Sequence, residues 1–296
     1  MENHKAGFVN IIGKPNVGKS TLMNALTGEK LSIITSKSQT TRHRISGIIN
    51  GDDFQIVYSD TPGIILNPAY KMQEAMNNFV SSSLQDADIM LFITDIYEKE
   101  EDEPVDTLRK LGYIEIPKIL LINKIDLDKE NKVEELVEHW KAKDIFDHVI
   151  PISALNKENV DILMGLILQS LPTHPAFYPK DTLTDKPERF FMSEIIREKI
   201  LMNYKKEIPY SCEVEIEEFK EDDKIVRIRA IIYVERKSQK GIIIGNQGAA
   251  IKKMATQARK DMEIFLCKKV FLETFVKVQE KWRSNERDLK NFGYQH

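Results

Sequence analysis

Gly13-Lys14-Pro15-Asn16-Val17-Gly18-Lys19-Ser20 is the stretch that decides the fold, and it matches the pattern G-x-x-x-x-G-K-[ST]. The apolar segment 8–12 precedes it, and residues 21–28, beginning with Thr21, have a short helical pattern that ends in glycine. Strand, glycine-rich turn and helix form the context that this pattern requires. Backbone N–H groups at such a turn converge on a phosphate chain. We therefore predict a phosphate-binding loop in which Lys19 reaches the outer phosphates and the Ser20 hydroxyl binds Mg²⁺.

Length and charge predict more than one domain. The chain has 296 residues, of which 42% are hydrophobic and 30% charged, enough for two ordinary cores. The formal net charge of -3 taken alone argues against a nucleic-acid partner. From Arg236 onward, however, 14 Lys/Arg stand against 6 Asp/Glu. This basic section is therefore considered separately for nucleic-acid binding.

Cysteine and histidine usage indicates neither disulfides nor a zinc site. Cys212 and Cys267 lack a C-x-x-C partner, so we expect reduced thiols and a cytosolic protein. The six histidines have no metal-ligand spacing. No apolar run has the length of a secretory leader core or of a membrane span, so we expect neither secretion nor membrane insertion.

A second motif follows a predicted strand over 55–60. The strand ends at Asp60, and Thr61, Pro62 and Gly63 come next. An aspartate at the carboxyl end of a strand beside a phosphate-binding loop is placed to hold the Mg²⁺ shell. The Gly63 N–H can then approach the terminal phosphate closely. Residues 37–44 form a polar stretch between β-like segments, and we interpret it as a mobile loop.

A third motif follows the predicted buried strands 89–95 and 118–123. The second of these strands delivers Asn123, Lys124, Ile125 and Asp126 at its carboxyl end. A carboxylate there accepts two parallel hydrogen bonds from guanine that adenine cannot offer, which indicates GTP rather than ATP. Backbone N–H groups of the turn Ser153-Ala154-Leu155 can reach the guanine carbonyl oxygen.

Helical patterns such as 133–140 alternate with the strands, which predicts a doubly wound α/β sheet in a first domain over 1–172. The acidic cluster 98–103 is interpreted as a solvated loop and helix start.

The three motifs in this order match the translation-factor-like GTPases. Ras-like proteins place a glutamine after the glycine of the second motif, where this chain has Ile64, which has no polar atom to orient water. With Asn16 and the stretch Thr40-Thr41-Arg42, this departure resembles bacterial GTPases that use a bound potassium ion. The resemblance implies that Asn16 is a K⁺ ligand and that Thr41, in preference to Thr40, is an Mg²⁺ ligand. It leaves Lys19, Asn16, Thr41 and Gly63 as the catalytic groups.

A second domain is predicted after a proline-rich linker over 173–187. Within residues 188–296, a helix spans 188–203, and alternating strands over 213–217 and 226–230 flank a hairpin turn. The segment 241–248, a helical pattern over 251–265 and an alternating segment over 270–278 follow.

This element order resembles a type II KH domain, a smaller α+β fold that binds RNA. In KH domains a G-x-x-G turn, here Gly245-Asn246-Gln247-Gly248, clamps about four single-stranded nucleotides. The following Lys252 and Lys253 add positive charge. By itself the turn would be an ordinary glycine helix cap.

The tail over 279–296 is basic and contains Trp282. It could stack on a base, lie on an anionic membrane, or dock Trp282 and Phe292 into its own domain, and we favour docking.

Together these features resemble the Era family of bacterial ribosome-assembly GTPases, within the TrmE-Era-EngA-like group. The resemblance implies GTP and GDP, Mg²⁺ and K⁺ as ligands, and binding to the 3′ end of small-subunit (16S) ribosomal RNA, not DNA, during 30S assembly. It also implies peripheral association with the inner face of the cell membrane, which nothing in the sequence demands.

Two other functions remain open at this point. One is a tRNA-modification GTPase, which shares the asparagine and Thr-Thr-Arg features but would carry a modification domain in place of the KH pattern. The other is an RNA-assembly clamp in which GTP turnover is incidental.

Overall fold

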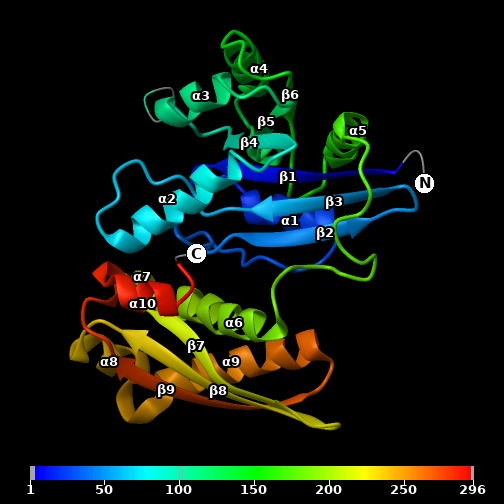
Figure 1. The fold of residues 1–296 in the computed structure, drawn as a ribbon. Helices are drawn as coiled ribbons and strands as arrows, with labels where there is room; N and C mark the ends of the chain where they lie inside the picture. The colour runs from blue at the N-terminus through cyan, green and yellow to red at the C-terminus, as the bar shows by residue number, and fades with distance from the viewer. Residues whose placement is uncertain (1–3, 100, 102, 295–296) are drawn as a thin grey trace. The chain divides into compact units, whose positions relative to one another are not determined.

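The computed structural model describes residues 4–99, 101 and 103–294, which belong to two compact units (Figure 1). The first unit consists of the chain up to Pro68 together with Met76–Asp185. The second consists of Ala69–Ala75 and the chain from Lys186 onward. No helix among the described residues is both long and apolar enough to cross a membrane.

Six strands in the described part of the first unit form one sheet, in the order β2-β3-β1-β4-β5-β6. Every neighbouring pair is parallel except β2 and β3. The strands are β1 (Lys5–Gly13), β2 (Ile45–Asn50), β3 (Phe54–Asp60), β4 (Ile89–Asp95), β5 (Lys118–Asn123) and β6 (His148–Pro151). The helices are α1 (Lys19–Thr27), α2 (Lys71–Ser83), α3 (Val105–Gly112), α4 (Val133–Lys141) and α5 (Val160–Ser170).

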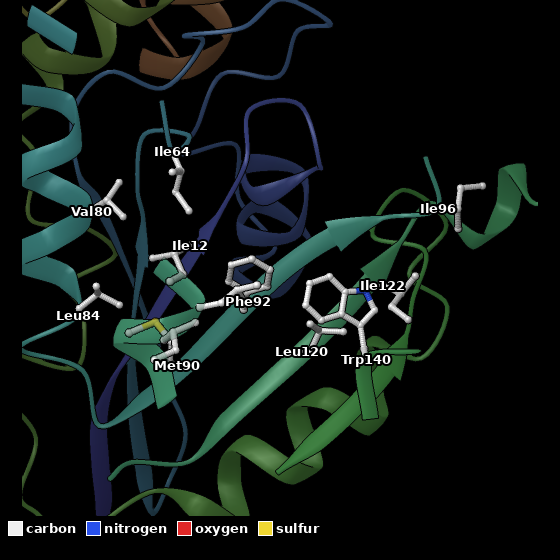
Figure 2. Close-up of a cluster of buried hydrophobic side chains, with 12 residues drawn as sticks. Ile12, Ile64, Val80, Leu84, Met90, Phe92, Ile96, Leu120, Ile122 and Trp140 are labelled. Atoms are coloured by element: carbon white, nitrogen blue, oxygen red, sulfur yellow. The ribbon is translucent and has the colours of Figure 1, made fainter. Parts of the chain in front are cut away.

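Helices cover both faces of this sheet, so the predicted doubly wound architecture is confirmed. On one face, β1, β4 and β5 pack against α2, α3 and α4 in a core cluster that includes Phe92 and Trp140 (Figure 2). On the other face, the Tyr58 hydroxyl of β3 contacts Met164 of α5. All seven residues of β4 are buried, as expected of a central parallel strand.

The strand register brings the motif loops to one edge of the sheet. Asp60 at the end of β3 pairs with Ile11 of β1, and Asn123 at the end of β5 pairs with Asp95 of β4. Because the carboxyl ends of parallel strands meet at the same edge, the loops that follow them lie side by side.

The second unit contains a three-stranded sheet in the order β7-β8-β9. A hairpin joins the antiparallel strands β7 and β8, and β9 runs parallel to β8. Its elements are α6 (Glu188–Asn203), α7 (Ile208–Ser211), β7 (Glu213–Glu221), β8 (Ile225–Val234), α8 (Lys237–Ile244), α9 (Ala249–Leu266), β9 (Lys269–Val278) and α10 (Glu286–Asn291). The predicted order of helices and strands is confirmed, α10 is the C-terminal helix of the docking interpretation, and the short helix α7 was not expected.

The C-terminal segment docks on its own unit. Trp282 is fully buried, and its Nε1–H donates to the Ser211 carbonyl oxygen at 3.0 Å. The Phe292 ring meets the Trp282 ring edge to face at 5.4 Å. The docking interpretation of the tail is therefore confirmed.

The predicted linker over 173–187 is bound to the first unit as far as Asp185. The Leu183 carbonyl oxygen accepts the Ile48 N–H at 2.8 Å, and the Asp185 carboxylate accepts the Ser46 N–H at 3.0 Å. The segment therefore covers the edge strand β2, whose backbone groups would otherwise lack partners.

The acidic cluster is not simply a solvated loop. The carboxylate of Glu98 is buried against Lys14 at 3.0 Å, and that of Glu103 is buried against Lys143 at 2.8 Å. Both partners are remote in sequence, so local charge could not reveal them. Residues 100 and 102 of the cluster lie outside the described residues.

Candidate functional site

The phosphate-binding loop joins β1 to α1. Gly18 begins the helix with a φ of 104°, and a Cβ there would lie only 2.1 Å from Nδ2 of Asn123, so the position requires glycine. The Lys19 ammonium donates to the carbonyl oxygens of Gly13 at 3.1 Å and Lys14 at 2.6 Å. Burial lowers the pKa of Lys19 to about 8, and the charge of Asp60 opposes this shift.

Side-chain oxygens of three residues that could bind a metal ion meet beside this lysine. The Ser20 hydroxyl donates to Oδ2 of Asp60 at 2.7 Å, and the Thr41 hydroxyl lies 2.9 Å from that of Ser20 and 3.3 Å from the same carboxylate oxygen. Oδ1 of Asp60 is buried without a hydrogen-bond partner among the described residues. Burial raises the pKa of Asp60, and Lys19 and the hydroxyl groups oppose the shift. This set of hard oxygen donors, with one carboxylate oxygen unused, fits Mg²⁺.

The two threonines of the loop before β2 differ in their hydrogen bonds. The Thr40 hydroxyl lies 2.7 Å from that of Thr35 and donates to the Lys37 carbonyl oxygen at 2.6 Å, both within the loop. The structure thus brings the Thr41 hydroxyl, and not that of Thr40, to Ser20 and Asp60.

At the other end of the site, Asn123 ties three loops together. Its Nδ2 donates to the Val17 carbonyl oxygen at 2.7 Å, and its Oδ1 accepts the Ala154 N–H at 2.9 Å. The Ser153 hydroxyl donates to the Asp126 carboxylate at 2.6 Å, which fixes the orientation of that carboxylate. Lys124 forms an ion pair with Asp95 at 2.5 Å, a partner that no motif revealed.

A cavity of about 260 Å³ lies between these groups. Twelve of the residues predicted for the nucleotide and its metal ions line it: Pro15, Asn16, Gly18, Lys19, Ser20, Thr21, Thr41, Gly63, Asn123, Lys124, Asp126 and Leu155. Nine further predicted residues are not in its lining and belong to the same loops or to the strand ends before them: Gly13, Lys14, Val17, Asp60, Thr61, Pro62, Ile125, Ser153 and Ala154.

Sequence reasoning missed the part of the lining that lies outside the motifs. Ile33, Ile34, Thr35, Gln39 and Leu127 also line the cavity, as does Thr40, which the sequence offered only as the alternative Mg²⁺ ligand. Most of them lie between α1 and β2, and only the position of that stretch between two motifs could have suggested a contact with the nucleotide.

Ile64 does not join the site. Its side chain is 8% exposed and lies in the hydrophobic core with Ile12 and Val80 (Figure 2). Its N–H donates to the Gly13 carbonyl oxygen at 3.1 Å, and at the preceding residue a Cβ on Gly63 would lie 2.7 Å from the backbone of Pro15. The second motif therefore contacts the phosphate-binding loop through its backbone. The motif predicts Ile64 as one of the nucleotide-binding residues, but its side chain belongs to the core.

The G-x-x-G turn joins α8 to α9 in the second unit. Gly245 has a φ of 73°, and a Cβ there would lie 2.5 Å from Cβ of Ala250, so close approach of the two helices requires glycine. Asn246 and Gln247 are exposed at the tip of the turn, and no atom lies within 4 Å of a Cβ placed on Gly248. Lys252 and Lys253 are exposed near the start of α9. The turn thus presents open backbone and two cations to solvent.

Two family models match the chain. A model described as a 50S ribosome-binding GTPase matches residues 8–124, and a KH-domain model matches residues 207–283. Among curated relatives, GTPase Era of Clostridium kluyveri is 45% identical over 98% of this chain and 99% of its own length. GTPase ERA1 of Zea mays chloroplasts is 45% identical over 99% of this chain and 71% of its own length.

Two solved structures are similar over nearly the whole chain. One is Era in complex with MgGDPNP and nucleotides 1506–1542 of 16S ribosomal RNA, with 37% identity, a TM-score of 0.94, and coverage of 99% of this chain and 100% of that one. The other is a point variant of Aquifex aeolicus Era bound to GDP and AlF4⁻, with 38% identity, a TM-score of 0.91 and the same coverage. The domain composition, the full-length identity and the GTPase motifs agree, and the chain is a GTPase that belongs to the Era family.

Proposed function

We propose that this GTPase is a nucleotide-controlled switch that binds the 3′ end of small-subunit (16S) ribosomal RNA and assists assembly of the 30S subunit. The observation that carries the nucleotide-binding part of the proposal is the convergence of five separate sequence segments on one cavity. The RNA half is supported by the exposed turn Gly245–Gly248 and by the Era structure that contains a 16S fragment.

The chain's residues have distinct roles in this proposal. Lys19 holds the outer phosphates, and the backbone N–H of Gly63 faces the terminal phosphate. Ser20, Thr41 and Asp60 would hold Mg²⁺, which when bound neutralises charge on the phosphates. The reaction is in-line attack of water on the γ-phosphoryl group. Asp126 accepts hydrogen bonds from the guanine base.

A potassium ion at Asn16 is part of the proposal. Asn16 lines the cavity next to Lys19, and the buried side chain of Ile64 cannot orient a water molecule. A cation at Asn16 would offset charge that develops on the phosphates, as an arginine finger does in other GTPases. Membrane association is not part of the proposal, because Trp282, the tail aromatic that could have inserted, is buried.

The switch is tested by GTP hydrolysis with and without an RNA oligonucleotide that copies the 16S 3′ end. We expect the RNA to stimulate turnover, and Asn246→Asp combined with Gln247→Asp to abolish the stimulation because two carboxylates repel phosphate. Asn246→Ser with Gln247→Ser is the neutral control. Tight RNA binding with unchanged turnover would instead favour the clamp with incidental hydrolysis.

Guanine selectivity is tested by Asp126→Asn. The variant should lose about a hundredfold or more in GTP affinity and prefer xanthosine triphosphate, because two hydrogen bonds to a charged acceptor are lost. Competition binding measures the preference. Asp128→Asn is the matched control, since that carboxylate accepts backbone N–H groups of residues 130, 132 and 133 outside the cavity lining. An Asp126→Asn protein that still selects GTP would refute the assignment.

The role of the loop threonines is tested by a matched pair. Thr41→Ala should lower the hydrolysis rate at least about tenfold, because it removes one of three metal-binding oxygens. Thr40→Ala should have a much smaller effect, because that hydroxyl bonds within its own loop. Steady-state kinetics over a range of Mg²⁺ concentrations measures both variants, and a larger loss for Thr40→Ala would reverse the assignment.

The potassium site is tested by single-turnover hydrolysis in KCl and in NaCl at one ionic strength. We expect at least about a tenfold faster rate in KCl, since a well-placed cation stabilises transition-state charge. Asn16→Ala should remove the difference. Equal wild-type rates in the two salts would rule out the site.

A further inference from the structure

A buried polar cluster lies between the sheet of the first unit and α2. Asn10 of β1 and Ser59 of β3 are buried and stand opposite each other in the strand register. The strand alternation puts Asn10 on the same face as Ile12, which packs in the core cluster (Figure 2). Nδ2 of Asn10 donates to the carbonyl oxygen of Ser83, in α2, at 2.7 Å. A buried amide and a buried hydroxyl on neighbouring strands need further hydrogen-bond partners in this apolar layer.

Arg44 supplies these partners. Its Nε donates to the Ser59 hydroxyl at 2.5 Å, and one terminal nitrogen donates to Oδ1 of Asn10 at 3.2 Å. The guanidinium also binds both carboxylate oxygens of Asp86, at 2.5 and 3.1 Å. Asn10 in turn donates to the same carboxylate at 2.7 Å. All three guanidinium nitrogens are thus used, in a planar arrangement that a lysine ammonium cannot reproduce.

Arg44 stands at the boundary between a loop and the sheet. It is the last residue of the Thr41 loop, which is the stretch over 37–44, and the ladder between β2 and β3 begins one residue later, at Ile45 and Asp60. Strand pairing therefore holds the chain only from Ile45 onward. The Arg44 side chain extends this attachment by one residue into the loop.

The contact between Arg44 and Ser59 lies next to the proposed metal site. Thr41 is three residues before Arg44, and Asp60 directly follows Ser59. The Thr41 hydroxyl lies 3.3 Å from the Asp60 carboxylate. The hydrogen bond between Arg44 and Ser59 thus joins, close to their metal-binding ends, the two segments that bring these oxygens together.

We propose that Arg44 is a positioning residue for the Mg²⁺ site, which keeps the Thr41 hydroxyl within reach of the ion by anchoring the end of the Thr41 loop to the sheet. This role rests on the proposed function, in which Thr41 binds Mg²⁺. Groups that hydrogen-bond around a metal site orient its ligands, and their loss costs metal affinity although no ligand is removed. Without the anchor the loop gains conformational freedom, which binding of the ion then has to remove.

A role confined to packing would give a different pattern of losses. The phosphate-binding loop directly follows β1, so a network that only stabilised the sheet would support nucleotide binding with or without metal. A positioning role affects Mg²⁺ binding selectively, because Lys19 and Asp126 stay in place. Because Arg44 then acts through Thr41, substitutions of the two residues should not be additive.

The anchor is tested with the full-length chain by calorimetric titration of Mg²⁺ into its complex with a non-hydrolysable GTP analogue, and by binding of that analogue in EDTA. Arg44→Ala should weaken Mg²⁺ binding at least about tenfold and leave binding in EDTA unchanged. Arg44→Lys should recover part of the loss, because an ammonium cannot bond all three partners at once. Thr41→Ala combined with Arg44→Ala should bind Mg²⁺ no more weakly than Thr41→Ala alone.

Two further variants separate the anchor from a folding defect. The Asp86 side chain is 49% exposed, and Asp86→Asn keeps one accepting oxygen, so this variant should fold and show a smaller loss of Mg²⁺ affinity. Arg189→Ala is the matched control, since that guanidinium donates to the carbonyl oxygens of Ile216 and Glu217 in the second unit. It should leave Mg²⁺ binding unchanged.

The outcomes distinguish the anchor from the function on which it rests. If Thr41→Ala weakens Mg²⁺ binding and the Arg44 and Asp86 variants do not, the anchor is overturned while the proposed metal site stands. Equal losses with Mg²⁺ and in EDTA, or an additive loss in the double variant, would also overturn the anchor. If Thr41→Ala itself leaves Mg²⁺ binding unchanged, the metal site of the proposed function fails and the anchor fails with it.

Discussion

The nucleotide site depends on one buried side chain, the amide of Asn123. It donates to the Val17 carbonyl oxygen and accepts the Ala154 N–H, so both ends of the amide are used. A buried amide tolerates neither end unpaired, and the three loops that it joins are therefore fixed relative to one another. This fixes the spacing between the phosphate-binding loop and Asp126, the residue proposed to bind guanine. Gly18 is the corresponding constraint on the backbone, because any side chain there would occupy the position of the amide.

At the opposite end of the site, the buried charges of Asp60 and Lys19 are incompletely compensated by the groups around them. Burial raises the pKa of Asp60 and lowers that of Lys19, although each opposes the shift of the other. One oxygen of Asp60 remains without a partner among the residues that the structure describes. Asp60 and Lys19 lost their interactions with water on burial, and one carboxylate oxygen has nothing in its place in the described part of the chain. A metal ion beside Asp60 and phosphates beside Lys19 would supply favourable interactions for both charges. In the proposed metal site Thr41 supplies an oxygen from the loop before β2, so Mg²⁺ binding would depend on the position of that loop.

Hydrogen bonds connect the strand after this loop to the segment that leads into the second unit at Lys186. The loop is followed directly by β2, whose edge is hydrogen-bonded to residues 183–185 through Ser46 and Ile48. The chain then enters the second unit at Lys186. By composition the proline-rich segment resembles a flexible spacer. In the structure its last residues are hydrogen-bonded to the edge strand β2. Hydrogen bonds therefore join β2, the strand that follows the Thr41 loop, to the segment that precedes α6.

The sequence by itself determined the elements and the chemistry of the motifs. Glycine and lysine at set spacings, apolar strand runs and strict alternation are local signals, so they predicted the phosphate-binding loop, the doubly wound sheet and the order of the second unit. Tertiary structure alone decided which residues meet across the chain. It buried Ile64 in the core, paired Glu98 with Lys14, brought Ile33 and Gln39 to the cavity, and joined Arg44 to Asn10 and Ser59. Those outcomes depend on packing and burial between segments distant in sequence, and no local pattern contains that information.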